Sequence, residues 1–166
     1  MNISIIIGTR PNFIKVTQFK KHAVKYGHNI KIIHTGQHYD KNMSTVFFDQ
    51  FGLVPDRFFE LKSKNQMQQV GEIMANLEQE FTENRPDLVL VPGDVNSTFA
   101  GAFVANRMGI KIGHIESGLR SFDREMPEEV NRILTDEITD IYFITEPSGI
   151  ENLTKEGKDP KKIQYV

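Results

Sequence analysis

Short apolar runs alternate with longer amphipathic segments along the whole chain. The apolar runs are rich in isoleucine and valine, and few polar residues interrupt them. Such runs are typical of strands that are buried on both faces of a sheet. They predict strands over residues 3–7, 29–34, 58–61, 87–91, 111–115, 141–145 and 163–166.

Between these runs, apolar residues recur at spacings of three and four, which is typical of amphipathic helices. Gly27, Gly109 and Gly157 follow three of these segments, and Pro127 suits the first turn of another. The predicted helices cover residues 12–26, 43–51, 65–84, 98–108, 127–138 and 148–156. Strands that alternate with helices predict an α/β fold, a Rossmann-like parallel sheet with helices on both faces, as one domain over residues 1–166.

Composition narrows the class of protein. The 166 residues carry 20 Lys and Arg against 22 Asp and Glu, a formal net charge of −2, which gives no electrostatic case for a nucleic-acid partner or an anionic membrane. The absence of cysteine excludes disulfides, thiolate metal sites and a catalytic thiol, and it fits a cytoplasmic protein. Neither a signal peptide nor an apolar run long enough for a membrane span is visible.

Polar and charged residues gather where the predicted strands end. In open parallel sheets, ligands bind at the carboxyl ends of the strands, so these residues are the first candidates for a site. They include a glycine turn beside two cations, Arg10 and Lys15, which favours an anionic ligand. Three carboxylates, Asp94, Glu116 and Glu128, follow later strands and predict acid/base chemistry on a phosphorylated substrate.

Each of these residues also has an ordinary structural interpretation. Asp94 could cap the helix that follows it, and Glu128 could pair with Arg132 on a helix surface. Glu129 is typical of a first helical turn, where its negative charge interacts favourably with the helix dipole. His114 lies inside a predicted strand, where a core histidine with satisfied hydrogen bonds is the commoner case.

Several familiar sites are missing from the sequence. His34 and His38 are four residues apart, but a glycine between them breaks any helix, so a metal pair is not expected. No G-x-G-x-x-G follows the first strand, and no G-x-x-x-x-G-K-[ST], H-E-x-x-H or G-x-S-x-G occurs. Nicotinamide, flavin and P-loop nucleotide sites are therefore unsupported.

Five segments in order resemble the non-hydrolysing UDP-N-acetylglucosamine 2-epimerase family. They are GTRP (8–11) with Ile14 and Lys15, TGQH (35–38), PGDVNST (92–98), HIESGLR (114–120) and PEEVNR (127–132). The resemblance implies the N-terminal domain of a GT-B-type two-domain fold, with the C-terminal domain outside this chain. It also implies an inversion at C2 of the sugar, in which UDP is eliminated to give 2-acetamidoglucal and then added back.

The resemblance assigns roles to nine positions. The implied acid/base residues are Asp94, Glu116 and Glu128, without an assignment to either face of C2. The implied substrate-binding residues are Arg10, Lys15, Gln37, His38, Arg120 and Arg132. No metal and no cofactor is needed. A UDP-sugar substrate, a homodimer and the C-terminal domain in cis are the implied partners, and we expect the isolated chain to fold but to turn over little substrate.

The resemblance specifies the sugar of the substrate less precisely than it specifies the reaction. TGQHYD (35–40) and Arg120-Ser121-Phe122 lean toward members that epimerise UDP-diacetamido-uronic acids. Asp40 and Asn65 stand where members activated by a second substrate molecule carry glutamine and arginine, and an acid near a phosphate argues against that activation. A non-catalytic nucleotide-sugar binding domain and half of a glycosyltransferase stay open as alternatives.

Overall fold

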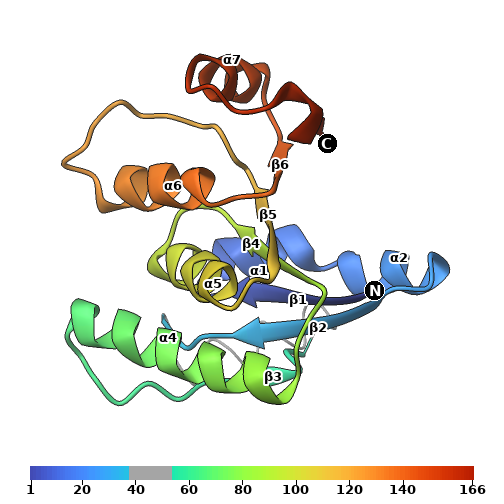
Figure 1. Ribbon diagram of the computed structural model, residues 1–166. Helices are drawn as coiled ribbons and strands as arrows, with labels where there is room; N and C mark the ends of the chain where they lie inside the picture. The colour runs from blue at the N-terminus through green and yellow to red at the C-terminus, as the bar shows by residue number, and fades with distance from the viewer. Residues whose placement is uncertain (38–53) are drawn as a thin grey trace.

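A single parallel sheet organises the computed structural model, which describes residues 1–37 and 54–166 (Figure 1). Within these residues the sheet has seven strands in the order β3-β2-β1-β4-β5-β6-β7. The strands are β1 (Asn2–Ile7), β2 (Asn29–His34), β3 (Arg57–Phe58), β4 (Leu88–Pro92), β5 (Lys111–Ile115), β6 (Ile141–Ile144) and β7 (Ile163–Tyr165). The predicted helix over residues 43–51, His38 and Asp40 lie outside the described residues.

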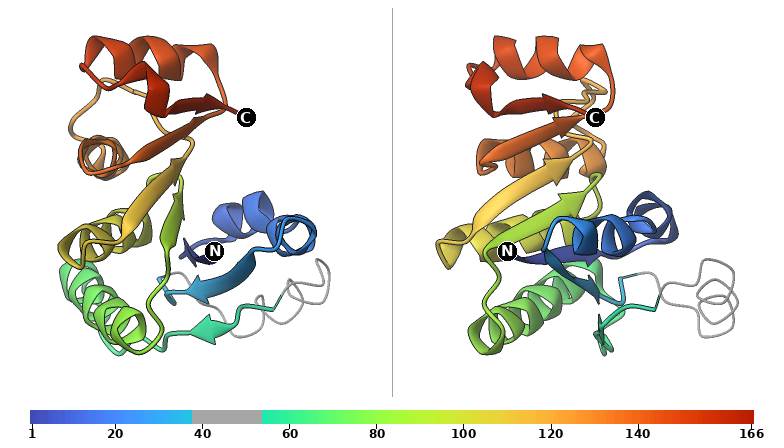
Figure 2. Two further views of the ribbon diagram at one scale, coloured as in Figure 1. Left: turned by 45° about the vertical axis from the view of Figure 1, so that its right-hand side comes forward. Right: turned by 90° about the vertical axis from the view of Figure 1, so that its right-hand side faces the viewer.

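Helices cover both faces of the sheet, as the alternating pattern predicts. α1 (Arg10–Val16) and α2 (Phe19–Lys25) lie on one face, and α4 (Gln66–Glu83), α5 (Asn96–Arg107) and α6 (Pro127–Glu137) lie on the other (Figure 2). α7 (Pro147–Lys155) packs against β6, and a short 3₁₀ helix (Pro160–Lys162) leads into β7. No helix in the described ranges has the length and apolar character that crossing a membrane requires.

The chain reverses its direction of travel across the sheet between β1 and β4. From β1 the chain moves outward through β2 to β3, and from β4 it moves the other way through β5 to β7. Because crossovers between parallel strands are right-handed, this reversal places the helices on opposite faces. The carboxyl ends of β1 and β4 flank the switch point, where open α/β sheets bind ligands.

Two apolar layers hold the sheet between its helices. Ile6 and Val89 point toward α4 and α5, where they belong to a buried cluster with Leu77. The neighbouring residue Ile5 points to the opposite face and packs with Phe13 of α1. Successive strand residues therefore supply both cores, which is why the strands are almost continuously apolar.

The first predicted helix is two helices. Thr17 ends α1, because its N–H and its Oγ1 both donate to the Ile14 carbonyl, at 3.5 and 3.1 Å. This three-residue spacing tightens the last turn and interrupts the α-helical hydrogen bonds. The chain then restarts at Phe19 with α2.

Two further boundaries differ from the pattern. The strand predicted over residues 58–61 is only Arg57–Phe58, because its partner residues Ile33 and His34 are the last two of β2. Asn65 lies just before α4 and caps it, since its Oδ1 accepts from the Met67 N–H at 2.9 Å. Asn65, one of the two residues that differ from the activated family members, is thus the N-cap of a helix.

Candidate active site

The switch point is closely packed where β1 ends. A Cβ placed on Gly8 would overlap the hydroxyl of Ser97 and lie 2.7 Å from its Cβ. Only glycine fits here, because the turn after β1 meets the first turn of α5. This contact holds the turn after β1 against the first turn of α5.

An uncharged group of side chains, Thr35, Gln37 and Ser97, surrounds this contact, and we call it the neutral cluster. The Thr35 and Ser97 hydroxyls lie 2.7 Å apart. Oε1 of Gln37 accepts from the N–H and the Oγ of Ser97 at 2.9 and 2.6 Å. Gln37, which the resemblance assigns to substrate, therefore caps the start of α5, where Val95 offers no capping side chain.

The start of α1 is attached to the end of β4 by an amide. Asn12 is buried, its Nδ2 donates to the Pro92 carbonyl at 3.1 Å, and its Oδ1 accepts from Thr9 at 2.9 Å. These bonds link the turn after β1 to the turn after β4. They hold α1 where Lys15 reaches over the Gly93 turn.

Lys15, Asp94, Glu116 and Arg132 form a second group beside this turn, which we call the charged cluster. The Lys15 ammonium lies 2.5 Å from Oε2 of Glu116, and these side chains are 30% and 27% exposed. Arg132 of α6 forms an ion pair with Asp94, whose side chain is also 27% exposed. Two of the three predicted acid/base carboxylates thus each hold a cation from a distant helix and keep access to solvent.

Gly93 lies between the two ion pairs. From the position of a Cβ on Gly93, Lys15 Nζ is 3.7 Å and Glu116 Oε2 is 3.9 Å away. Gly93 adopts a φ of +71°, and Glu116 adopts a φ of +67°. This left-handed backbone conformation is unfavourable in free energy for any residue that has a side chain, as Glu116 does. Such strain is common at ligand sites, where packing imposes it.

Asp94 does not cap α5, because the N-cap position is Val95. Among the described residues, it is Gln37 whose side chain accepts from the first turn of this helix. Arg132 does not pair with Glu128 either. Its Nη1 lies 3.0 Å from Glu129, and its Nη2 bonds to Asp94. The geometry therefore replaces both ordinary structural interpretations of these residues.

Two other predicted residues, Glu128 and Arg10, are exposed at the starts of their helices. Glu128 is exposed on the first turn of α6, and its side chain has neither a hydrogen bond nor an ion pair within the described part of the chain. Arg10 is exposed at the first position of α1. His38 lies outside the described residues.

Arg120 is buried behind the site instead of lining it. Its side chain is 2% exposed, and its guanidinium bonds to Glu156 at 2.8 and 2.6 Å and to Asp136 at 2.8 Å. The substrate-binding role that the resemblance implies stays a prediction, and in this structure two carboxylates engage the guanidinium. Arg120 stabilises the loop after β5.

His114 and Asp136 are fully buried next to Arg120. His114 Nδ1 lies 2.7 Å from Oδ1 of Asp136, and its Nε2 lies 2.7 Å from the Gly93 carbonyl. Burial alone raises the pKa of Asp136, but the hydrogen bonds and charges of His114 and Arg120 outweigh it and hold the pKa below its ordinary value. The expected core histidine is present, and both of its ring nitrogens have partners.

Glu129 lies in the first turn of α6, as the sequence suggested, and its side chain is buried. Its carboxylate accepts from the N–H groups of Ser121 and Phe122 at 2.9 and 3.1 Å. Burial raises the pKa of Glu129, but these hydrogen bonds and the charge of Arg132 lower it by more, so the pKa lies below its ordinary value. Glu129 therefore fixes the loop before α6, because a buried carboxylate needs such partners.

Sequence reasoning missed Asn12, Ser97 and Asp136. Ser97 lies inside the segment 92–98 and Asn12 directly follows the segment 8–11, so their neighbourhood was signalled but their partners were not. Asp136 is the second-last residue of α6, and nothing in the local pattern distinguishes it from a surface acid. In residues 1–37 and 54–166, no three metal-ligating side chains gather closely enough to hold an ion.

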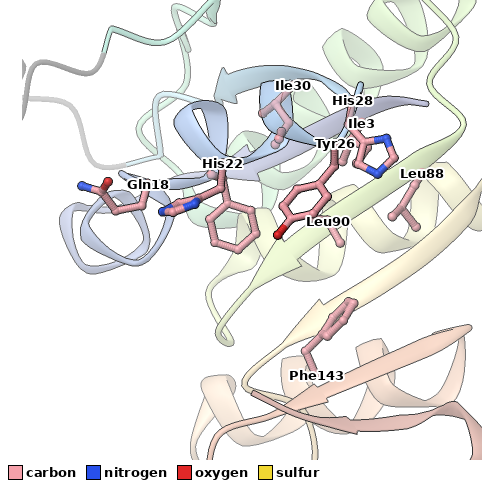
Figure 3. A pocket seen from close by; sticks show the side chains of 11 residues that line it. Ile3, Gln18, His22, Tyr26, His28, Ile30, Leu88, Leu90 and Phe143 are labelled. Atoms are coloured by element: carbon pink, nitrogen blue, oxygen red, sulfur yellow. The ribbon is translucent and has the colours of Figure 1, made fainter.

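An apolar cavity of about 380 Å³ lies elsewhere, on the face that α2 covers (Figure 3). Ile3, Leu88, Leu90 and Phe143 line it from the sheet, and Tyr26 lines it from the end of α2. None of the residues of the charged cluster borders it. The cavity is therefore separate from the predicted acid/base residues at the strand ends.

A parallel sheet with paired carboxylates and cations at its switch point defines a Rossmann-like ligand-binding domain. The family model described as UDP-N-acetylglucosamine 2-epimerase matches residues 21–166. The chain belongs to the UDP-N-acetylglucosamine 2-epimerase family, as the five segments suggested.

Relatives match the whole chain but extend beyond it. UDP-N-acetylglucosamine 2-epimerase of Methanococcus maripaludis is 43% identical over 99% of the chain and 44% of its own length. UDP-2,3-diacetamido-2,3-dideoxy-D-glucuronate 2-epimerase of Pseudomonas aeruginosa is 44% identical over 100% and 48%. The chain spans about half the length of these relatives and corresponds to their N-terminal half.

Solved structures agree with the fold. The Methanocaldococcus jannaschii UDP-GlcNAc 2-epimerase, solved in complex with UDP-GlcNAc and UDP, superposes with a TM-score of 0.94 at 41% identity, over 100% of this chain and 46% of that one. Acinetobacter baumannii MurG reaches 0.64 at 10% identity, over 89% and 42%, a likeness of fold alone. The predicted Rossmann-like domain of the GT-B type is confirmed.

Proposed function

We propose that this chain is the N-terminal half of a nucleotide-sugar 2-epimerase that interconverts UDP-N-acetylglucosamine and UDP-N-acetylmannosamine. The observation that carries the proposal is the charged cluster around Gly93. Two carboxylates, Asp94 and Glu116, lie partly exposed at the switch point, and each is held by a cation. A domain that only binds a nucleotide sugar has no need of carboxylates poised there.

The chemistry needs a base and a stabilised leaving group together. A carboxylate removes the C2 proton, the C1–O bond breaks, C1 and C2 become doubly bonded, and UDP leaves with the electron pair. In the reverse step UDP adds back to C1 and an acid returns a proton to the opposite face of C2. We assign Asp94, Glu116 and Glu128 to these proton transfers, without dividing the two faces among them.

The cations serve the diphosphate and the carboxylates. Lys15 and Arg132 hold Glu116 and Asp94 in the unbound site, and with Arg10 they supply positive charge for the departing UDP. Gln37 contributes by holding the start of α5 in place. Arg120 holds the loop after β5, where Asp136 and Glu156 engage its guanidinium.

A second substrate competes with UDP-N-acetylglucosamine. The Pseudomonas aeruginosa relative named for UDP-2,3-diacetamido-2,3-dideoxy-D-glucuronate is as similar to this chain as the Methanococcus maripaludis relative named for UDP-N-acetylglucosamine. The same proton transfer at C2 serves both sugars, so the charged cluster does not choose between them. A homodimer, a cytoplasmic location and low turnover by this half alone stay predictions.

The test is proton NMR in D₂O with the full-length polypeptide that contains this chain. Each of the two nucleotide sugars is supplied in turn, and we expect the C2 proton signal of one to disappear while its epimer forms. Transfer of the sugar to an acceptor without exchange at C2 would support a glycosyltransferase instead. Binding of a nucleotide sugar with no exchange of either would leave the non-catalytic binding domain as the better interpretation.

A further inference from the structure

The turn after β4 and the loop after β5 are joined by one side chain that the proposed chemistry does not use. His114 is the fourth residue of β5, two positions before Glu116. Its Nε2 reaches across to the Gly93 carbonyl at 2.7 Å, and Gly93 immediately precedes Asp94. His114 therefore sits between the two acid/base carboxylates of the charged cluster.

The hydrogen bonds of His114 define where its protons are. The Gly93 carbonyl can only accept, so Nε2 carries a hydrogen. Oδ2 of Asp136 accepts from the Gly118 N–H at 3.1 Å and from Arg120 at 2.8 Å, which favours the ionised carboxylate. Its Oδ1 lies 2.7 Å from Nδ1 of His114, so the same carboxylate also orients the ring.

Asp136 attaches several parts of the site to α6 at once. It holds the loop after β5 through the Gly118 N–H and Arg120, and it holds the turn after β4 indirectly through His114. Both side chains of the His114–Asp136 pair are 0% exposed. Solvent therefore cannot replace either bond when it is lost.

We infer that His114 is a positioning residue, oriented by Asp136, that fixes the Gly93–Asp94 turn at the distance from Glu116 that the proposed epimerisation requires. The inference rests on the proposed function for its catalytic consequence. The physical basis is that Gly93 is left-handed and joins β5 through two bonds, from its N–H to the Ile115 carbonyl and from His114 to its own carbonyl. Removing the Nε2–H leaves the buried Gly93 carbonyl without that donor, and a shift of the turn by about 1 Å is expected to cost about 10²-fold in rate.

Two substitutions separate the two bonds. His114→Gln places an amide N–H at the position of Nε2 and keeps the Gly93 bond, whereas it loses the bond to Asp136. His114→Asn places its amide at the position of Nδ1 and keeps the Asp136 bond, whereas it loses the bond to Gly93. A purely structural role predicts the greater damage from His114→Gln, because it leaves a buried carboxylate short of a partner.

The first measurement is kcat and KM of the full-length enzyme, with the unfolding temperature of each variant. We expect His114→Asn to lower kcat by about 10²-fold with KM within about threefold, and His114→Gln to keep kcat within about fivefold although it unfolds at the lower temperature. Activity that follows stability in both variants would overturn the inference, as would wild-type kcat in His114→Asn.

The second measurement does not depend on activity. The Gly93 N–H donates to the Ile115 carbonyl at 2.9 Å, so its exchange with deuterium reports whether the two turns stay together. We expect faster exchange in peptides spanning residues 92–97 in His114→Asn only, with α4 unchanged. Equal protection of the Gly93 N–H in the wild type and both variants would refute the positioning role. A wild-type enzyme that exchanges the C2 proton of neither sugar would refute the proposed function, but the deuterium-exchange test of the His114–Gly93 bond would remain valid.

Discussion

Two polar clusters occupy the same edge of the sheet and differ in every property that matters for function. The neutral cluster of Thr35, Gln37 and Ser97 is uncharged, and its hydroxyl and amide oxygens form hydrogen bonds with one another and with the start of α5. The charged cluster beside Gly93 pairs its ions across helices and leaves its carboxylates about a quarter exposed. Position at the strand ends is therefore not enough to identify a site.

The difference follows from the cost of burying each kind of group. A buried hydroxyl or amide is satisfied by one or two ordinary hydrogen bonds, so the neutral cluster can close the crevice and stabilise the fold. Ionised groups are costly to bury, and those that keep solvent access stay available for a ligand. The neutral cluster is thus expected to govern stability, and the charged cluster is expected to govern activity.

The largest expected effect is on activity in the charged cluster. Glu116→Gln removes the proton-transfer group but keeps its shape, and exchange at C2 should fall by about 10²–10⁴-fold in the full-length enzyme. The free energy of unfolding should change by less than about 1 kcal/mol, since the pair with Lys15 is partly exposed. Glu151→Gln on α7, whose side chain is 72% exposed, is the matched control and should keep wild-type activity. Undiminished exchange in Glu116→Gln would remove Glu116 from the mechanism.

The next effect is on stability at the Gly8 contact. Gly8→Ala forces a methyl group into Ser97, so α5 must move away from β1, and the free energy of unfolding should fall by about 3 kcal/mol. Gly71→Ala, inside α4 with open space around its Cβ, should instead gain about 0.5–1 kcal/mol. Urea unfolding measures both. Similar stability in the two variants would show that the crevice is less tightly packed than the contact indicates.

A pH effect is expected at His34, which borders the neutral cluster. Burial lowers the pKa of His34 from 6.5 to about 4, and its neutral Nδ1 accepts from the Gly36 N–H at 3.0 Å. The unfolded chain binds the proton more readily, so this stability is complete above pH 6.5 and is lost as the pH falls toward 4. The loss between pH 7.5 and 5 should be about 2 kcal/mol, from the difference between these pKa values.

His34→Asn isolates this contribution. Asparagine keeps an acceptor for the Gly36 N–H but does not titrate, so the variant should lose less stability than the wild type between pH 7.5 and 5. Urea unfolding at a series of pH values measures the difference. Parallel pH profiles for the two proteins would mean that His34 binds its proton in the folded state as readily as in the unfolded state.

The smallest effect is expected from Ser97→Ala in the neutral cluster. It removes one hydroxyl that Thr35 and Gln37 share, and the free energy of unfolding should fall by about 1 kcal/mol. C2 exchange should stay within about threefold of the wild type, because the charged cluster is untouched. A large loss of exchange with little loss of stability would show that the two clusters are not separate in function.

Much of the fold could be predicted from local pattern. The strand predicted over residues 111–115 is β5 as observed, and the helix predicted over residues 127–138 is one residue longer than α6. Where the prediction failed, the cause was a contact that the pattern does not encode. The side chain of Thr17 bonding back to Ile14 divides a segment whose apolar spacing is continuous.

The candidate site could be predicted only in part. Asp94, Glu116 and Lys15 were placed at one edge because parallel strands end together, and the structure brings them around Gly93. The burial of Arg120 could not be predicted, because its partners, Asp136 and Glu156, lie far along the chain. Local sequence cannot show which of several cations a carboxylate will hold.

The sequence by itself determined the alternation of strands and helices, the glycine turns and the gathering of ionisable groups at one edge of the sheet. Each of these follows from hydrophobic periodicity, backbone freedom and strand direction, which are properties of neighbouring residues. Only the tertiary structure decided that Lys15 holds Glu116 across 101 residues and that His114 and Asp136 share a buried bond. Pairing and burial of charge depend on residues that folding alone brings together, because both require the final distance and the exclusion of water.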